Sequence, residues 1–342
     1  FGYAEKNDVK RKELRQKLFR NGIVYQLFLC VGFIIIANLY AIKFDDLKWI
    51  ILLFSIRLFG MFLQSHLTID YRINGFNKKF ALLNIFVNCL GLIFTFFLTI
   101  YFGAIGYMIS LAIGPFICLF FFSKNILQQS INDLSEMNWK MMWKYGRMES
   151  FAYFASELLF SIDIAMIAIF MADKDIALYK VAIILPMNLL FLPTILFQTD
   201  FPRIVQNADN KAFLKFYIYN YLKLFIPLGM IILIGSYFLK DWLLTLFFNQ
   251  DYLAGNSVFF IATITVVFAM LFRVLFLNLF SAVGLFNYNV RISIISIITL
   301  IIADAILIPI YKLNGAAFGF LIMFIVSGFY AGFLFRNYLK GL

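Results

Sequence analysis

The chain has 342 residues, of which 63% are hydrophobic, 20% aromatic and only 14% charged, and its mean hydropathy is +0.90. Soluble domains carry roughly 45–50% apolar and about 25% charged residues, so this chain has too little charge to cover a water-facing surface. The composition excludes a soluble globular enzyme, a secreted disulfide scaffold and a disordered chain. It predicts a polytopic membrane protein, in which the net charge of +11 reflects basic loops on one side of the membrane rather than nucleic-acid binding.

Ten apolar runs are long enough to cross a bilayer as helices, which takes about 20 residues. The runs are continuous and lack the alternation of outer-membrane strands, so helices rather than a barrel are predicted. In chain order, the predicted spans are 22–42, 48–67, 80–102, 104–123, 149–171, 177–199, 216–239, 256–282, 290–310 and 313–335.

A long polar joint, 124–148, separates the first four spans from the last six. We expect a basic lead over 1–21, an incomplete N-terminal lobe over 22–123, a cytoplasmic linker over 124–148 and a C-terminal lobe over 149–342.

A weak internal repeat accompanies this division. Residues 100–107 and 310–317 both place a turn of small residues between two adjacent spans. Paired lobes of this kind are the usual construction of transporters, with the substrate path between the repeats.

The basic residues of the loops predict the orientation of the chain. Twenty Lys and Arg residues lie in one set of loops and six in the opposite set. Because Lys and Arg accumulate on the cytoplasmic side, both ends of the chain are predicted to be cytoplasmic.

Metal and cofactor chemistry has no support in the sequence. Cys30, Cys89 and Cys118 all lie within apolar runs, and the single histidine, His66, follows a span. These residues are typical of membrane-protein interiors, so no metal site and no cofactor are expected.

The span 149–171 carries the clearest polar stripe. On a helix, four of its polar or aromatic side chains fall within about 40° of Glu149, and Glu157 lies at the edge. In a lipid-buried helix such a stripe lines either a substrate cavity or a hydrogen-bonded seam between spans. The stripe consists of Glu149, Tyr153, Ser156, Phe160 and Asp163, with Glu157 beside it.

Charged residues within other spans are further candidates for a site, because charge is costly near the bilayer centre. Arg57, with Gln64 on the same face, and Arg273 would bind an anionic substrate such as a phosphate. Alternatively, each arginine forms a structural pair with an acid such as Asp163 or Asp304. Both aspartates are also candidates for coupling to a proton or a cation, since buried carboxylates can titrate.

Several short motifs occur in an order typical of one transporter family. A basic segment precedes the first span, an aromatic and basic turn with glycine follows the second, and a Tyr-Gly entry leads to an intramembrane aspartate. The motifs are Lys10–Arg15, Tyr71–Lys78, Trp143–Gly146, Ile162–Ala165, Ala177–Ala182 and Phe201–Arg203. Over its whole length the chain resembles the polysaccharide (O-antigen, Wzx-type) flippases of the multidrug/oligosaccharidyl-lipid/polysaccharide exporter (MOP) superfamily.

The resemblance implies an all-α fold of two helical lobes, like that of the MATE exporters, with 12 or 14 spans in a complete member. Since ten are predicted here and residue 1 is Phe, we expect two leading spans to be missing. The implied function is translocation of an undecaprenyl-diphosphate-linked oligosaccharide across the bacterial cytoplasmic membrane by alternating access. This would serve the synthesis of O-antigen, capsule or a related polysaccharide, with a polysaccharide polymerase as a partner.

Two other functions stay open. One is a cation-coupled multidrug antiporter of the same superfamily, in which the intramembrane acids would be indispensable. The other is a membrane polysaccharide polymerase or glycosyltransferase. The longest outer loop, 240–256, offers only Asp241 and Asp251 as acids, and no nucleophile or phosphate-loop motif occurs, so we expect a transporter rather than an enzyme.

Overall fold

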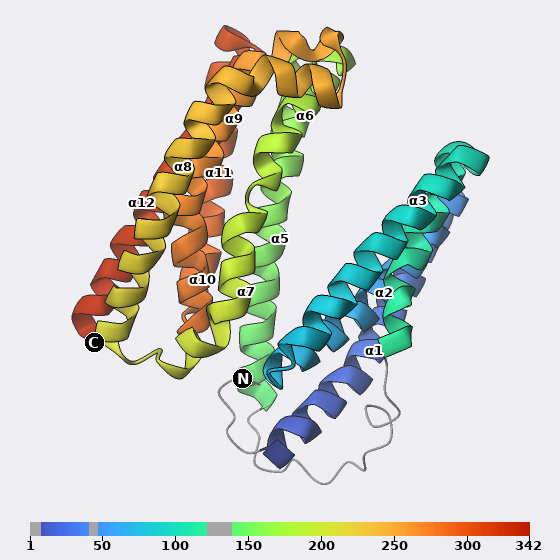
Figure 1. Cartoon of the computed structure of the whole chain (residues 1–342), viewed down its shortest axis with the longest axis vertical. Coiled ribbons are helices and arrows are strands. Elements are labelled where there is room, and N and C mark those ends of the chain that lie inside the picture. The colour runs from blue at the N-terminus through green and yellow to red at the C-terminus, as the bar shows by residue number, and fades with distance from the viewer. Residues whose placement is uncertain (1–7, 41–46, 122–138) are drawn as a thin grey trace. The chain divides into compact units, whose positions relative to one another are not determined.

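The computed structural model describes residues 8–40, 47–121 and 139–342, and within these ranges the chain is built from helices. Predictions that fall on 1–7, 41–46 and 122–138 lie outside the described residues. The chain separates into two compact units, 1–137 and 138–342, drawn in blue to teal and in green to red in Figure 1.

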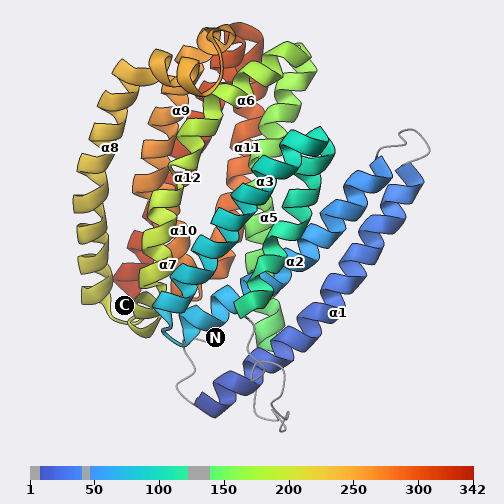
Figure 2. The same ribbon diagram turned by 45° about the vertical axis from the view of Figure 1, so that its right-hand side comes forward.

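Three long helices and a short one form the N-terminal unit. Figure 2 shows α1 and α2 side by side, and α2 also packs against α3. Apolar side chains from α2, α3 and η1 meet in one core, with Leu67, Leu83 and Cys118 fully buried. The elements are α1 (Asp8–Tyr40), α2 (Leu47–Ile73), α3 (Asn77–Ile113) and η1 (Gly114–Phe121).

A polar cluster ties the α1–α2 pair together near one end of this unit. Arg15 of α1 forms a salt bridge with Asp70 of α2, which is only 5% exposed. The amide of Asn74 also donates to Asp70, at 2.8 Å, and the hydroxyl of Tyr71 donates to the carbonyl of Phe121 at 2.9 Å. Arg15 and Asn74 thus satisfy the buried carboxylate of Asp70, which would otherwise be costly, while the Tyr71 bond ties α2 to η1.

The chain reverses direction inside α3, at Gly103, where φ is 58° and ψ is −137°. Two helical segments then pack so closely that a Cβ on Gly106 would collide with the carbonyl oxygen of Leu98. The hydroxyls of Thr95 and Ser110 meet across the pair at 2.9 Å. Glycine is therefore favoured at the turn, where the positive φ strains other residues, and it is required three residues later for close approach.

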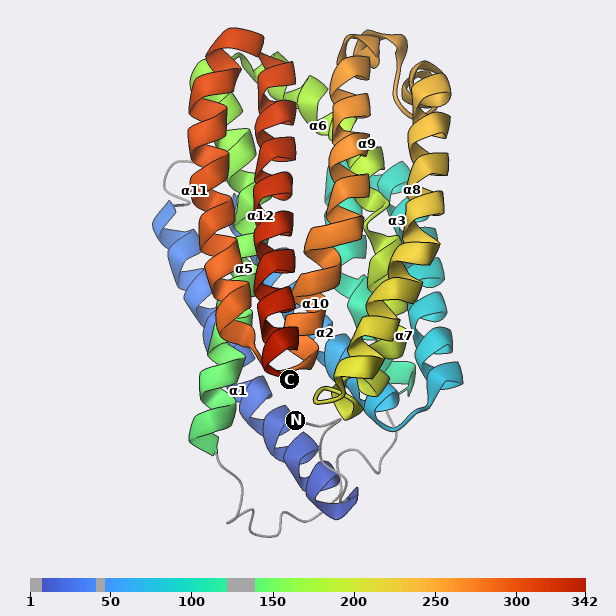
Figure 3. The ribbon, with the colours of Figure 1, turned by 90° about the vertical axis from the view of Figure 1, so that its left-hand side faces the viewer.

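Ten elements form the C-terminal unit. Figure 3 shows α11 and α12 as neighbours, and α12 also packs against α9. In α9, nine of 14 residues are buried, which explains why this segment is apolar all round. The elements are α5 (Trp139–Phe170), α6 (Asp173–Asn188), α7 (Phe191–Gln206), α8 (Lys211–Phe247), η2 (Gln250–Gly255), α9 (Asn256–Ala269), the π-helical η3 (Met270–Val274), α10 (Leu275–Ala282), α11 (Phe286–Tyr311) and α12 (Leu313–Gly341).

The turn between α11 and α12 repeats the one inside α3. Lys312 has φ 53° and ψ −131°, nearly the values at the turn glycine of the N-terminal unit. Three residues later, a Cβ on Gly315 would collide with the carbonyl oxygen of Leu307, at the same offset from the turn. Each unit therefore contains a helical hairpin of the same construction, at the two segments in which the sequence has a weak repeat.

The expected all-α membrane fold is confirmed. Among the described residues, nine helical segments are long and apolar enough to cross a membrane. The segment Asn77–Phe121 contains the Gly103 reversal and so holds two predicted spans, 80–102 and 104–123. The predicted span 177–199 lies within one such segment, Asp173–Gln206, whose helix is interrupted around Leu189 between α6 and α7. Pro193 explains the interruption, because it cannot donate to the carbonyl of Leu189, four residues earlier, and its ring clashes with that carbonyl.

Candidate functional site

The interior of the C-terminal unit contains a chain of polar side chains along one face of α5. It begins at Glu149, whose Oε1 accepts a hydrogen bond from the Ser281 hydroxyl of α10 at 2.7 Å. The amide of Asn289 in α11 donates to the same hydroxyl at 2.8 Å. Glu149 Oε2 is buried and has no hydrogen-bond partner. Hydrogen bonds among Glu149, Ser281 and Asn289 thus link α5, α10 and α11, and Glu149 retains one carboxylate oxygen without a donor from the described residues.

Two turns further along α5, Ser156 contacts Arg273, the charged residue of the π-helical turn η3. Arg273 is 6% exposed, and its Nη2 donates to the Ser156 hydroxyl at 3.4 Å. Its guanidinium carbon lies 5.2 Å from the centre of the Phe324 ring, a cation–π contact. The Nε group is buried without an acceptor. Arg273 is therefore a buried cation held by one weak hydrogen bond and one aromatic ring.

Asp163, two turns beyond Ser156, lies beside Asp304 of α11. The hydroxyl of Tyr179 in α6 donates to Asp163 Oδ2 at 2.6 Å, while Asp163 Oδ1 has no hydrogen-bond partner. The two carboxyl groups interact with each other, and neither oxygen of the fully buried Asp304 has a partner of ideal geometry. Asp304 Oδ1 fits against Gly319 of α12, where any Cβ would displace it.

Two adjacent buried carboxylates repel each other, so this pair requires a proton or a cation between them. With Tyr179, the pair offers oxygen atoms only, which suit a proton or a hard cation. Across the described ranges, no group of three or more His, Cys, Asp or Glu side chains is arranged to hold a metal ion.

Arg273 does not neutralise these acids. Among the described residues, Arg273 forms no salt bridge with Asp163 or Asp304, so the predicted alternative of a structural ion pair is wrong for this arrangement. Arg273 packs beside Ser156, and the two aspartates lie about two helical turns further along α5. Each of the three side chains has a buried polar atom without a hydrogen-bond partner in the described part of the chain.

The predicted stripe on α5 divides into two sets. Glu149, Ser156 and Asp163 lie in the seam between α5 and its neighbours, the second of the two interpretations of the sequence. By contrast, Tyr153 is 69% exposed and Glu157 is also exposed. The three seam residues are seven positions apart and so return to the same side of the helix, whereas Tyr153 and Glu157 lie about 60° and about 100° around the helix from Ser156, at the margin of the seam.

The remaining predicted residues are in the N-terminal unit. Arg57 and Gln64 are both half-buried on α2. Within the part of the chain that the structure describes, neither makes a hydrogen bond or a salt bridge. Arg57 and Gln64 are seven residues, or about two helical turns, apart and therefore lie on the same face of α2.

Sequence reasoning missed several neutral partners of the site. Besides Tyr179 and Ser281, α11 contributes a polar stripe at helical spacing that faces α5. The signal was present in the sequence as polar residues three or four positions apart in an otherwise apolar helix. The missed members of the stripe are Asn289, Ser293 and Ser296, which are buried, as is Asp304, the predicted candidate eight residues further along α11.

Comparisons with known proteins support the fold. No protein-family model matches the sequence, and no curated protein matches it. Among solved structures, the chain is similar to the lipid II flippase MurJ in an inward closed conformation, with a TM-score of 0.70 and 18% identity, over 98% of this chain and 74% of MurJ. It is also similar to an outward-facing MATE-family multidrug resistance transporter of the MOP superfamily, with a TM-score of 0.72 and 13% identity, over 97% of this chain and 81% of that one. The chain has the fold of these two transporters.

Proposed function

We propose that the chain is a flippase that translocates an undecaprenyl-diphosphate-linked oligosaccharide across the membrane by alternating access, for the synthesis of O-antigen, capsule or a related polysaccharide. The observation that carries this proposal is the similarity over 97–98% of the chain to two transporters, one of them described as a lipid II flippase. The motifs that resemble polysaccharide flippases point to the same class of lipid-linked substrate.

In this proposal, Arg57 binds the diphosphate. Its guanidinium is half-buried on α2 and has no partner among the described residues, so it can give bidentate hydrogen bonds to phosphate oxygens without breaking an existing pair. Gln64, on the same face, offers an amide to the first sugars. The exposed Tyr153 and Glu157 of α5 supply an aromatic surface and an acceptor for sugar hydroxyls.

Arg273 takes part in a different way. Because it is 6% exposed, contact with the substrate requires a state in which α5 and η3 separate. Its hydrogen bond to Ser156 is long, at 3.4 Å, and a π-helical turn often marks a functional site. We therefore assign Arg273 to the second anion contact of the transport cycle, reached after this seam opens.

Asp163 and Asp304 form the coupling site of the proposal, with Tyr179 orienting the first carboxylate. Uptake of a proton or a monovalent cation would remove the repulsion between the two acids and stabilise the packing of α5, α6, α11 and α12. Release of the ion would favour another arrangement of these helices. In this proposal an ion gradient drives transport, and flux of the substrate is the other source of energy, since no nucleotide-binding motif occurs in the sequence.

The proposed location is the bacterial cytoplasmic membrane, with both ends of the chain in the cytoplasm. The excess of Lys and Arg in one set of loops supports this orientation. A polysaccharide polymerase that accepts the flipped substrate is the proposed partner.

A cation-coupled multidrug antiporter is the second candidate, favoured by the similarity to the MATE-family transporter. The two functions make different demands on the residues. A flippase of a diphosphate-linked lipid needs Arg57, whereas an antiporter for cationic drugs needs Asp163 and Asp304 alone.

The test uses the purified chain in proteoliposomes with a fluorescent undecaprenyl-diphosphate oligosaccharide, whose exposure to an added quencher reports the leaflet. The flippase proposal predicts that Arg57→Ala abolishes translocation, while Lys174→Ala, an exposed basic residue elsewhere, leaves it unchanged. Translocation at the normal rate by Arg57→Ala contradicts the assignment of the diphosphate site. Drug efflux that requires only the two aspartates establishes the antiporter, and sugar transfer by the purified protein establishes an enzyme.

A further inference from the structure

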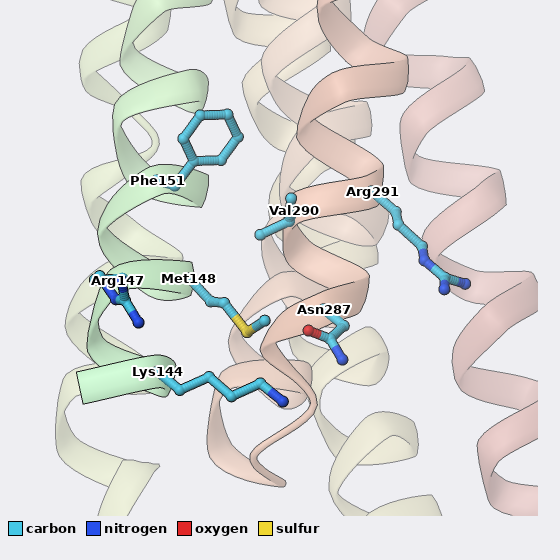
Figure 4. A pocket seen from close by; sticks show the side chains of 7 residues that line it. All are labelled: Lys144, Arg147, Met148, Phe151, Asn287, Val290 and Arg291. Carbon is cyan, nitrogen blue, oxygen red and sulfur yellow. The ribbon is translucent and has the colours of Figure 1, made fainter. Parts of the chain in front are cut away.

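A cavity of about 460 Å³ lies between the first turns of α5 and α11, next to the end of the polar seam that begins at Glu149. Both helices begin at this end of the C-terminal unit, and Figure 4 shows the side chains that line the space between them. They are Lys144, Arg147, Met148, Phe151, Asn287, Val290 and Arg291.

The polar part of this lining is strongly cationic. Lys144, Arg147 and Arg291 are all exposed, and among the described residues no acidic side chain lines the cavity. In Figure 4 the Lys144 side chain extends from α5 toward Asn287 of α11, Arg147 lies on the α5 side, and Arg291 extends away from α5 on the other side of α11. Long exposed side chains of this kind can swing toward an anion held between the two helices.

None of the three cations is neutralised within the described residues. The Nε of Arg147 donates only to the carbonyl of Trp143, at 3.4 Å, and the guanidinium of Arg291 lies 5.9 Å from the Tyr288 ring centre. The nearby Glu149 faces the interior, where it accepts from Ser281. The cavity therefore has three positive charges in its lining and no counter-charge from the part of the chain that the structure describes, as an anion site does.

The other part of the lining is apolar, and the change follows the helix axis. Lys144 and Phe151 are seven residues apart on α5, so about 10 Å separates the cationic from the apolar region. On α5, Lys144 and Arg147 precede the predicted span 149–171 and Phe151 lies within it, while on α11 Val290 and Arg291 are the first two residues of the predicted span 290–310. The cavity thus lies at the depth in the membrane where the headgroup region meets the acyl-chain region.

From this arrangement we infer that the cavity binds an anionic phospholipid of the leaflet at the basic side of the membrane. Lys144, Arg147 and Arg291 would engage the phosphate, with the Asn287 amide as a further donor. Phe151, Met148 and Val290 would contact the first part of an acyl chain. Basic pockets between transmembrane helices on the cytoplasmic side are suited to such lipids. This inference depends on the fold and the cavity, and it holds whether or not the proposed substrate is correct.

The test measures lipid binding to the purified full chain in an uncharged detergent by native mass spectrometry. Phosphatidylglycerol and phosphatidylcholine, which share a phosphate and acyl chains but differ in net charge, are titrated separately. The triple variant Lys144→Gln, Arg147→Gln, Arg291→Gln is compared with a control variant. The control loses the same three charges at exposed positions on the same predicted side of the membrane, outside the cavity. The control variant is Lys215→Gln, Arg336→Gln, Lys340→Gln.

We expect the wild type and the control to bind the first phosphatidylglycerol at least about tenfold more tightly than the pocket variant does, since each Lys or Arg near an anionic headgroup contributes roughly a fivefold gain. Phosphatidylcholine binding should be the same in all three. If the triple variant does not purify as a monodisperse protein, Lys144→Gln and Arg291→Gln are tested singly, each with an expected loss of about fivefold.

Equal phosphatidylglycerol affinity in the pocket variant and the control would overturn the inference. Two further ligands identify the source of the phosphate. Inorganic phosphate that displaces phosphatidylglycerol at equal concentration would show a site for a free anion and would also overturn it. Undecaprenyl diphosphate that binds this pocket more tightly than phosphatidylglycerol would assign the cavity to the lipid carrier instead.

Discussion

Gly319 offers a way to disturb the carboxylate pair without changing any charge. A Cβ at this position of α12 would take the place of Asp304 Oδ1, and its neighbours there include the Asp304 backbone nitrogen. Gly319→Ala must therefore push the carboxyl group away from Asp163 or separate α11 from α12. Gly235→Ala is the matched control, because it lies inside α8 and a Cβ there would meet nothing within 4 Å.

The expected magnitudes follow from two terms. Replacing Gly by Ala inside a helix stabilises it by about 0.8–1 kcal/mol, and this is all that the Gly235 variant should show. At Gly319 the same gain is opposed by an overpacking cost of about 1–3 kcal/mol. The free energy of unfolding of Gly319→Ala should thus lie about 1–3 kcal/mol below that of Gly235→Ala. In a unit of this size that difference lowers Tm by roughly 2–12 °C.

The assay is thermal unfolding of both variants in one detergent, repeated with sodium replaced by choline at constant ionic strength and at two pH values. The wild type and Gly235→Ala should share one dependence of Tm on the coupling ion, whereas Gly319→Ala should lose most of it, because the pair no longer binds the ion. If Gly319→Ala unfolds at the temperature of Gly235→Ala or above, Asp304 does not occupy this position. If its ion dependence equals that of the wild type, the pair is not the coupling site.

Three further predictions concern single contacts, each measured by thermal unfolding. Lys312 has a positive φ of 53°. Lys312→Gly should therefore relieve about 1 kcal/mol of backbone strain, whereas Lys312→Ala should not. Equal Tm values for the two variants would contradict the assigned turn. Arg15→Gln leaves the carboxylate of Asp70, which is 5% exposed, without its cationic partner and should lower the free energy of unfolding by about 1–3 kcal/mol. Adding Asp70→Asn should restore part of this loss. Strictly additive effects of the two substitutions would show that the two residues do not interact. Tyr179→Phe removes the 2.6 Å hydrogen bond to Asp163 and should cost about 1–3 kcal/mol. This loss should disappear when Asp163 is also replaced by Ala, which has no acceptor for the hydroxyl.

Much of the fold was predictable because a bilayer imposes simple requirements on sequence. A helix that crosses it must be apolar for about 20 residues, so the spans could be found from length and composition alone. The helix boundaries were less predictable, since a helix can continue into water. α5 begins at Trp139, ten residues before the predicted span, with its first turns carrying polar and basic side chains.

The site was predictable only in part, because helical spacing fixes the face of a residue but not the neighbour that covers that face. Asp163 and Asp304 were both candidates, yet their contact joins positions far apart in the chain and depends on how α11 packs against α5. Tyr153 falls on the predicted stripe with Glu149, but it lies at the margin of the helix interface and is 69% exposed. The reversal at Gly103 and its counterpart at Lys312 show the same limit, since a weak repeat of small residues indicated a turn without specifying its geometry.

The most direct test of the central claim is the leaflet in which a lipid-linked oligosaccharide accumulates in a host that lacks the full-length gene. The substrate is labelled in growing cells, and its access to a membrane-impermeant modifying enzyme distinguishes the two leaflets. The flippase proposal predicts that the completed lipid-linked oligosaccharide accumulates on the cytoplasmic face and moves to the outer face when the gene is restored. Normal translocation in the deleted host, or a glycan that is never completed on its lipid carrier, would contradict it.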